Sequence, residues 1–303
     1  MSAARVPTPL PIPAIAAFAS LTLALTLLWA PRVRAGRFTV CPWVAPCGLA
    51  VAAALVGGVI DLRALPVLVA FSASCALARH SRGAGSATAH AVMLAVGAGL
   101  FLHAWPGFHN PVVIRDAVLG PESQPYTKYL NFDKGFAALL LLGIYAPDRT
   151  ATDDGVRRTH AFVWRFVVLV AGVLALTLAA GYVRWDPKLP QWWAMWLWSM
   201  VFLTALPEEA LFRGVAQAGL ERALGGFPWA QSGAIAIAGV LFGVAHAAGG
   251  PVYIGLATAA GVGYGWIYAS TRSIAAATLA HAGLNAVHFL FFSYPALAAQ
   301  AGG

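Results

Sequence analysis

Apolar runs of about 11 to 23 residues alternate with short polar gaps along the chain, and the only Asp, Glu, Lys or Arg inside these runs is Arg165. A helix needs roughly 20 apolar residues to cross a hydrocarbon core of ~30 Å. The pattern therefore predicts an all-α protein, a polytopic transmembrane helix bundle of about 8–10 spans. The runs are Pro13–Ala30, Val44–Ile60, Ala64–Ala78, Ala89–Trp105, Phe136–Ala146, Ala161–Val183, Trp192–Leu206, Ser232–Ala248, Pro251–Ala269 and Ile274–Phe292.

Two polar stretches interrupt this pattern. Residues 106–135 carry Pro, Gly, Asn and mixed charges with little helical periodicity, so we expect a long aqueous loop, either a connector or a flap that contacts substrate. A second polar linker lies near residues 149–158. It suggests a division into N-terminal membrane helices (1–160), which include the loop near 106–135, and a catalytic membrane core (161–303).

The composition agrees with a membrane protein. Hydrophobic residues make up 60% of the chain and charged residues 10%, whereas soluble domains are about 25% charged. The net charge of +8 comes from Arg and Lys that lie mainly in the gaps between apolar runs, a pattern of membrane orientation and not of a nucleic-acid surface. We expect a multi-pass integral protein of a bacterial plasma membrane, with the lipid bilayer and no nucleic acid as its partner.

The strongest chemical signal is a pair of adjacent glutamates. Glu208 and Glu209 directly follow the run Trp192–Leu206, and the chain has only four glutamates. Pro207 favours the alternative that both begin a helix outside the membrane. However, the run is only about 22 Å long as a helix, so the helix must continue through them to cross. Glu209 then faces Arg213 four residues later as an ion pair, whereas Glu208 has no local cation.

Histidines interrupt two later apolar runs. Phe242 and His246 lie four apart on one helix face, although a single histidine near a span end is often only interfacial. His281, Asn285 and His288 share one stripe of the last run. Lipid offers no hydrogen bonds, so these groups need partners on another helix or in a polar cavity. Helix-packing contacts are the alternative explanation, and they account for His288 as well as a catalytic role does.

A carboxylate pair, a histidine and a His/Asn pair on three helices can support hydrolysis. A carboxylate and a histidine can activate water, and a His with an Asn can stabilise an oxyanion. Glu208, His246 and His281 could instead hold a divalent metal such as zinc. The sequence leaves both mechanisms open, and it contains no HExxH, GxSxG or GxxxxGK[ST] motif.

These residues resemble the CPBP family, the type 2 CAAX prenyl endopeptidases and their bacterial relatives linked to bacteriocin processing and self-immunity. Members carry EExxxR, FxxxH and HxxxN or HxxxD, in this order, on three transmembrane helices. The corresponding residues here are Glu208, Glu209 and Arg213, then Phe242 and His246, then His281 and Asn285. The resemblance covers roughly Gln191–Phe292.

The resemblance implies an intramembrane endopeptidase that hydrolyses peptide bonds of a membrane-associated protein or peptide with water activated by carboxylate and histidine. Glu208 would activate the water with help from His246, and His281 with Asn285 would hold the oxyanion. Glu209 and the arginine of the first motif would form a structural ion pair. Members are commonly labelled metalloproteases, and a metal-free glutamate mechanism has also been described for the family.

Two other functions compete with this one. A non-catalytic membrane immunity or binding protein could share the fold, and a proton-coupled transporter could use buried Glu and His as a relay. A transporter is often built from internal repeats, and the sequence shows none.

Overall fold

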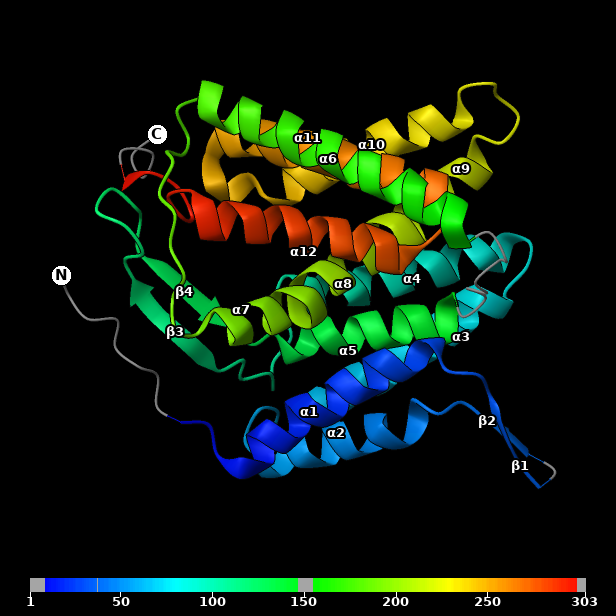
Figure 1. Ribbon diagram of the computed structural model, residues 1–303. Coiled ribbons are helices and arrows are strands. Elements are labelled where there is room, and N and C mark those ends of the chain that lie inside the picture. The colour runs from blue at the N-terminus through cyan, green and yellow to red at the C-terminus, as the bar shows by residue number, and fades with distance from the viewer. Residues whose placement is uncertain (1–8, 37, 147–154, 299–303) are drawn as a thin grey trace.

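The computed structural model describes residues 9–36, 38–146 and 155–298. Figure 1 shows a bundle built almost entirely of helices, with two short β-hairpins at its ends. The prediction of an all-α, polytopic membrane bundle is confirmed.

Within the described residues, the N-terminal half contains five α-helices and both hairpins. Strands β1 and β2 pair antiparallel, as do β3 and β4, and the second pair has register shifts. In this half a turn of 3₁₀-helix (η1, Leu27–Trp29) follows α1, and a π-helical turn (η2, Leu141–Tyr145) follows α5. The bounds are α1 Ile12–Thr26, β1 Val33–Ala35, β2 Phe38–Val40, α2 Val44–Val56, α3 Ala64–His80, α4 Ala84–Phe101, β3 Val112–Ala117, β4 Tyr126–Tyr129 and α5 Phe132–Leu140.

The C-terminal half contains α6, an irregular helix, a broken helix pair and α12. The irregular helix is the continuous stretch from α7 to α9, residues 193–223, and it contains the glutamate pair. The turns directly before and after this pair are π-helical. Figure 1 shows α12 between α6 and α11 on one side and α7 and α8 on the other. The bounds are α6 Gly155–Ala179, α7 Trp193–Met200, η3 Val201–Ala205, α8 Leu206–Glu209, η4 Ala210–Gln217, α9 Ala218–Ala223, α10 Ala230–Ala245, η5 Ala247–Gly249, α11 Gly250–Thr271 and α12 Ile274–Phe291.

The number of complete spans depends on how interrupted helices are treated. Among the described residues, three helices are long and apolar enough to cross a membrane: Ile12–Trp29, Thr159–Ala179 and Ile274–Phe291. A fourth span results if α10 and α11, which are bent by 59°, are counted together. Three other runs form continuous but shorter apolar helices, Val44–Val56, Ala64–His80 and Gly85–Phe101. π-helical turns interrupt the runs Phe136–Ala146 and Trp192–Leu206. The sequence pattern detects the apolar runs but not these interruptions.

The two halves share one large hydrophobic core. It joins Phe18 of α1, Phe71 of α3 and Leu139 of α5 to Leu203 and Leu206 of the irregular helix. The polar linker lies largely in residues 147–154, outside the described residues, and α6 begins before residue 160. The division into residues 1–160 and 161–303 therefore stays a prediction about which part carries the catalytic site. The two parts do not have separate hydrophobic cores.

The expected aqueous loop at 106–135 is largely structured. It forms the β3–β4 hairpin and the first turn of α5, and two of its charged residues, Lys128 and Asp133, are buried. The expectation of a solvated loop is wrong for these positions. Lys128 donates to Thr204 of the helix η3. Asp133 accepts from Asn110 and pairs with His103, both in the segment between α4 and β3.

Three glycines of α11 face three different neighbours. A Cβ on Gly261 would lie 3.0 Å from Cβ of Phe242, and one on Gly265 would lie 2.8 Å from Oε1 of Gln217. A Cβ on Gly263 would collide with Leu169 of α6. The absence of side chains at these positions allows α11 to approach its neighbours closely, which places α11 directly behind the polar site.

Candidate functional site

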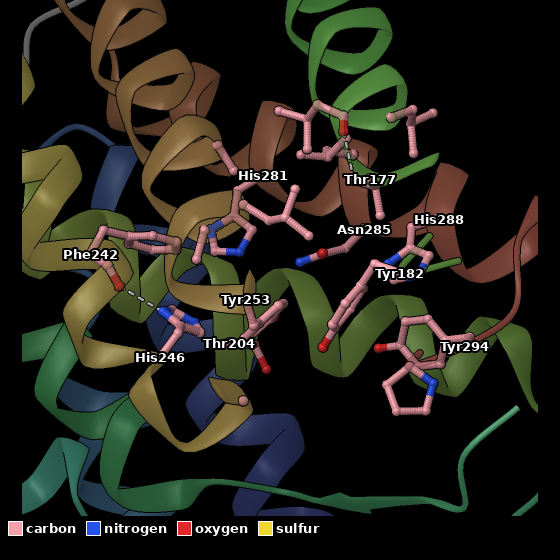
Figure 2. Close-up of a pocket in the computed structure, with 18 of the residues that line it drawn as sticks. Thr177, Tyr182, Thr204, Phe242, His246, Tyr253, His281, Asn285, His288 and Tyr294 are labelled. Atoms are coloured by element: carbon pink, nitrogen blue, oxygen red, sulfur yellow. Dashed lines mark hydrogen bonds between the residues drawn. The ribbon is translucent and has the colours of Figure 1, made fainter. Parts of the chain in front are cut away.

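A cavity of about 350 Å³ lies among α6, α10, α11, α12 and the irregular helix (Figure 2). It brings together all four residues that we predicted to be catalytic: Glu208, His246, His281 and Asn285 all line it. They come from three chain segments that are far apart in sequence. The cavity wall is otherwise largely apolar and aromatic.

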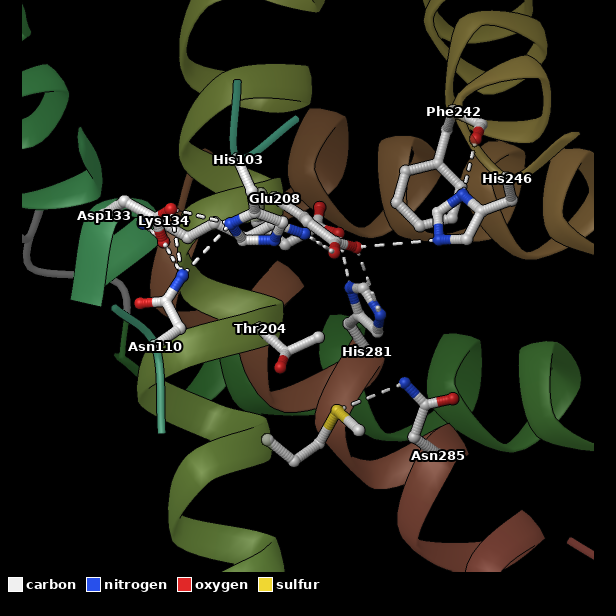
Figure 3. Close-up of polar contacts among 12 residues, drawn as sticks. His103, Asn110, Asp133, Lys134, Thr204, Glu208, Phe242, His246, His281 and Asn285 are labelled. Carbon is white, nitrogen blue, oxygen red and sulfur yellow. Dashed lines mark hydrogen bonds and ion pairs between the residues drawn. The ribbon is translucent and has the colours of Figure 1, made fainter. Parts of the chain in front are cut away.

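Glu208 occupies the centre of the polar contacts in Figure 3. Its side chain is about 10% exposed, and Oε2 lies 3.9 Å from Nε2 of His246 and 3.9 Å from Nε2 of His281. Oε2 has no hydrogen-bond partner among the described residues. A buried carboxylate oxygen thus faces two imidazole nitrogens at a distance slightly too long for a direct hydrogen bond.

The expectation that Glu208 lacks a cation holds only for its own helix. Nζ of Lys134, near the start of α5, lies 3.8 Å from Oε1 of Glu208. This lysine belongs to the stretch that the sequence suggested was a loop. The contact joins two segments more than 70 residues apart, so helical spacing gave no sign of it. Lys134 supplies the positive charge that helps a carboxylate to stay in an apolar bundle.

His246 lies at the break between α10 and α11. Its Nδ1 lies 2.7 Å from the carbonyl oxygen of Phe242. A carbonyl only accepts hydrogen bonds, so Nδ1 carries the hydrogen in this contact, and the neutral ring presents Nε2 to Glu208 as a proton acceptor. The ring centroids of Phe242 and His246 are 4.5 Å apart, so the i, i+4 pair is a packing contact as well as a hydrogen bond.

His281 lies between the two glutamates. Its Nδ1 lies 2.9 Å from Oε1 of Glu209, and its Nε2 faces Glu208. The ring of Tyr264 stacks on it with centroids 4.6 Å apart and an interplanar angle of 13°. The hydrogen bond and the stacking together fix the plane and the direction of this imidazole.

The predicted ion pair of Glu209 and Arg213 is present and fully buried. Nε of Arg213 donates to Oε2 of Glu209 at 2.9 Å, and both side chains have no solvent exposure. Gln217 continues the network, accepting from Nη1 of Arg213 at 3.3 Å and donating to the carbonyl of Gly265. We did not predict this role of Gln217 from the sequence, although its position four residues after Arg213 places the two side chains on the same helix face.

Asn285 and His288 lie farther along α12. Nδ2 of Asn285 approaches the sulfur of Met200 at 3.4 Å, a weak contact that leaves its amide facing the cavity. Nε2 of His288 bonds the carbonyl oxygen of Ser293 at 3.2 Å, and the ring also lines the cavity. Asn285 is therefore available to a ligand, and His288 has a local structural partner.

Comparison with known proteins supports the family resemblance. Residues 190–287, about a third of the chain, match the family model described as Type II CAAX prenyl endopeptidase Rce1-like. The resemblance seen in the three motifs is confirmed, and at the family level it supports an intramembrane protease of the CAAX type. No curated protein and no solved structure gave a significant match to the chain.

The Rce1-like segment contains every predicted catalytic residue but not every residue of the site. Lys134 lies outside it, as does Gln124, which lines the cavity. The N-terminal half of the chain is thus part of the site's surroundings.

The three residues suggested as metal ligands are spaced more widely than the ligands of a tetrahedral zinc ion. Among the described residues, no group of three His, Cys, Asp or Glu side chains is placed to hold a metal ion. Ligand atoms that share a tetrahedral zinc ion lie about 3.4 Å apart, whereas each Nε2 lies 3.9 Å from the Glu208 oxygen. Nδ1 of His281 donates to Glu209, as the second ring nitrogen of a metal-binding histidine commonly does, and Nε2 faces Glu208. The mechanism proposed below is derived from the side chains alone.

Proposed function

We propose that the protein is an intramembrane endopeptidase that hydrolyses peptide bonds of a membrane-associated protein or peptide. The observation that carries this proposal is the buried Oε2 of Glu208, which has no hydrogen-bond partner in the part of the chain that the structure describes and faces the Nε2 atoms of His246 and His281 at 3.9 Å. A single water molecule is of the right size to bridge such a separation. The cavity beside it has room for an extended peptide segment.

Glu208 and His246 are proposed to activate the water. The water oxygen attacks the peptide carbonyl carbon while its proton passes to the Glu208 carboxylate or to Nε2 of His246. The carbonyl of Phe242 holds the other ring nitrogen in the protonated form, which keeps Nε2 available as the base. The low exposure of the carboxylate favours proton transfer, since little bulk water competes for it.

His281 and Asn285 are proposed to stabilise the tetrahedral intermediate. Doubly protonated His281 donates from Nδ1 to Glu209 and from Nε2 to the oxyanion, and Asn285 donates from its amide one helical turn away. When the intermediate collapses, the C–N bond breaks and the proton taken from water passes to the leaving nitrogen. The products are a new carboxylate and a new amine, and the two active-site residues return to their starting state.

Terminal proteomics of intact membranes tests this proposal. Membranes containing equal amounts of wild type, Glu208→Gln or His246→Ala are compared for new protein termini. Glu122→Gln is the matched control, because Glu122 is exposed and pairs with Arg184 at the surface. We expect a set of termini that is present with wild type and Glu122→Gln and reduced at least 100-fold in both site variants.

Identical termini in all four samples would exclude proteolysis by this site. In that case the same fold acts as an immunity or binding protein without turnover. A loss of termini in Glu208→Gln but not in His246→Ala would support hydrolysis and overturn the role of the histidine as the assisting base.

A further inference from the structure

Arg165 is a cation on the membrane helix that the protein buries least. It is the only charged residue in the apolar run Ala161–Val183. An 18-residue window of the span Thr159–Ala179 in α6 is only 11% buried, compared with 39% and 44% for the spans Ile12–Trp29 and Ile274–Phe291. Most of α6 therefore faces lipid, and a guanidinium on such a helix is costly unless it has a partner.

The guanidinium of Arg165 lies against two tryptophan rings. Its Cζ is 4.3 Å from the ring centroid of Trp164 and 5.0 Å from that of Trp266. Nη1 donates to the carbonyl oxygen of Ala161 at 3.0 Å, whereas Nε is buried and has no hydrogen-bond partner among the described residues. No Asp or Glu in this part of the chain forms a salt bridge with it. The positive charge thus has two aromatic contacts but no counter-ion from the protein.

The depth of this group matches the boundary between lipid headgroups and acyl chains. Arg165 lies six residues, about 9 Å of helix rise, inside the start of the span at Thr159. Long side chains on a helix point back toward its N-terminus, and the bond to Ala161 brings the guanidinium to within about 3 Å of that start. Tryptophans are typical of the same level of a membrane. A lipid phosphate is therefore within reach of the guanidinium.

The surroundings of Arg165 favour an anionic lipid over a zwitterionic one. Figure 1 shows α6 alongside α11, and the contact of Trp164 with Trp266 places the start of α6 beside the end of α11. Arg272 directly follows α11 and pairs with Glu221 of α9, next to the exposed Arg222. Arginines at this end of the bundle repel the choline or ethanolamine group of a zwitterionic lipid and attract a headgroup of net negative charge.

We propose that Arg165, held between Trp164 and Trp266, binds the phosphate of an anionic phospholipid in the leaflet at the start of α6. Unused N–H donors of the guanidinium bond the phosphate oxygens, and the acyl chains lie along the exposed valines of the same helix. Because Val173 and Thr177 of α6 line the cavity of Glu208, the lipid supports one wall of that cavity from outside. The inference goes beyond the proposed reaction and does not depend on it.

Native mass spectrometry of the full chain in detergent tests this inference. The purified protein is titrated separately with dioleoyl phosphatidylglycerol, which is anionic, and with dioleoyl phosphatidylcholine, which is zwitterionic. The test variant is Arg165→Gln, which removes the charge and keeps a polar side chain. Arg222→Gln is the matched control, because it removes an exposed arginine at the same end of the bundle that has no tryptophan contact among the described residues.

Wild type and Arg222→Gln should bind the first phosphatidylglycerol about 10-fold more tightly than phosphatidylcholine. Arg165→Gln should bind the two lipids equally while its thermal unfolding stays cooperative. An excess of inorganic phosphate should leave the bound lipid in place, because free phosphate gains nothing from the apolar face of α6.

Equal binding of the two lipids by wild type would overturn the inference, whatever the variants do. A preference for phosphatidylglycerol that survives in cooperatively folded Arg165→Gln would also overturn it, as would a preference lost equally in Arg222→Gln, since the attraction would then be a general property of the basic end. Displacement of the lipid by inorganic phosphate would identify a phosphate site instead of a lipid site.

Discussion

Nδ1 of His281 lies 2.9 Å from Oε1 of Glu209, while the other oxygen of this carboxylate accepts a hydrogen bond from Nε of Arg213. The buried Glu209 carboxylate therefore contacts side chains of two helices. It neutralises the arginine of its own helix and orients the imidazole of α12 toward Glu208. The sequence indicated the first contact through a spacing of four, but the second joins residues 72 positions apart.

Removing the side chain of Glu209 should destabilise the fold more than removing that of an exposed glutamate. Glu209→Ala leaves Arg213 as an unpaired charge with no solvent exposure, so we expect the free energy of unfolding to fall by about 3–5 kcal/mol. Denaturation of the purified protein in mixed micelles measures the loss. Glu122→Ala, at an exposed ion pair, should cost less than about 1 kcal/mol. A double variant with Arg213→Ala should lose less than the sum of the two single losses, and strict additivity would argue against the coupling.

Lys134 should assist the reaction from outside the family segment. Lys134→Met removes the charge 3.8 Å from Oε1 of Glu208, and we expect the rate of substrate cleavage to fall about 10- to 100-fold. Lys134→Arg should recover most of the rate because it keeps the charge. The readout is the initial rate of formation of the termini that depend on Glu208. An unchanged rate in Lys134→Met would show that this ion pair has no part in the chemistry.

Close packing of α10 on α11 should be sensitive to a single methyl group. A Cβ on Gly243 would lie 2.6 Å from the carbonyl oxygen of Ile254 and would also collide with Thr258. We expect Gly243→Ala to cost about 1–3 kcal/mol and to reduce activity by displacing His246. Gly255→Ala on α11 is the control, since nothing lies within 4 Å of its Cβ position. That change should be neutral or stabilise by about 0.5–1 kcal/mol, and an equal effect at both sites would contradict the packing argument.

The stability of the protein should rise with pH above the pKa of Lys128. Burial lowers this pKa from 10.5 to about 8, with Glu208 opposing the shift and Lys134 adding to it. Between these two values the folded protein binds fewer protons than the unfolded chain, so the free energy of unfolding increases with pH. Relative to Lys128→Met, wild type should gain on the order of 2 kcal/mol between pH 8 and pH 10. Thermal unfolding measures both proteins across this pH range. If their melting temperatures change with pH in parallel, Lys128 is not a buried group with a lowered pKa.

Cleavage should not depend on a bound zinc ion. The spacing of Glu208, His246 and His281 does not match a tetrahedral zinc site, and no other described trio replaces them. We expect the Glu208-dependent termini to persist after treatment with 1,10-phenanthroline, and the purified active protein to contain less than one equivalent of zinc. Activity that disappears with the chelator and returns with zinc would contradict this expectation.

Much of the membrane architecture could be predicted from the sequence because apolar runs report burial in lipid directly. The helical class and the apolar segments follow from local patterns. The π-helical turns around Leu206–Glu209 and the bend at His246 did not follow. In the π-helical turns the backbone hydrogen bonds shift from i→i+4 to i→i+5, and at His246 they shift to i→i+3. The periodicity of apolar side chains reports neither change.

The sequence by itself determined which polar residues had to find partners in the bundle. Glu208, His246, His281 and Asn285 interrupt apolar runs at spacings that place them on defined helix faces, and lipid cannot satisfy them. Only the tertiary structure decided which of them meet, and that Lys134 and Lys128 of the supposed loop lie beside them. Periodicity fixes the direction of a side chain on its own helix, whereas contacts between distant segments depend on how the shared core brings the helices together.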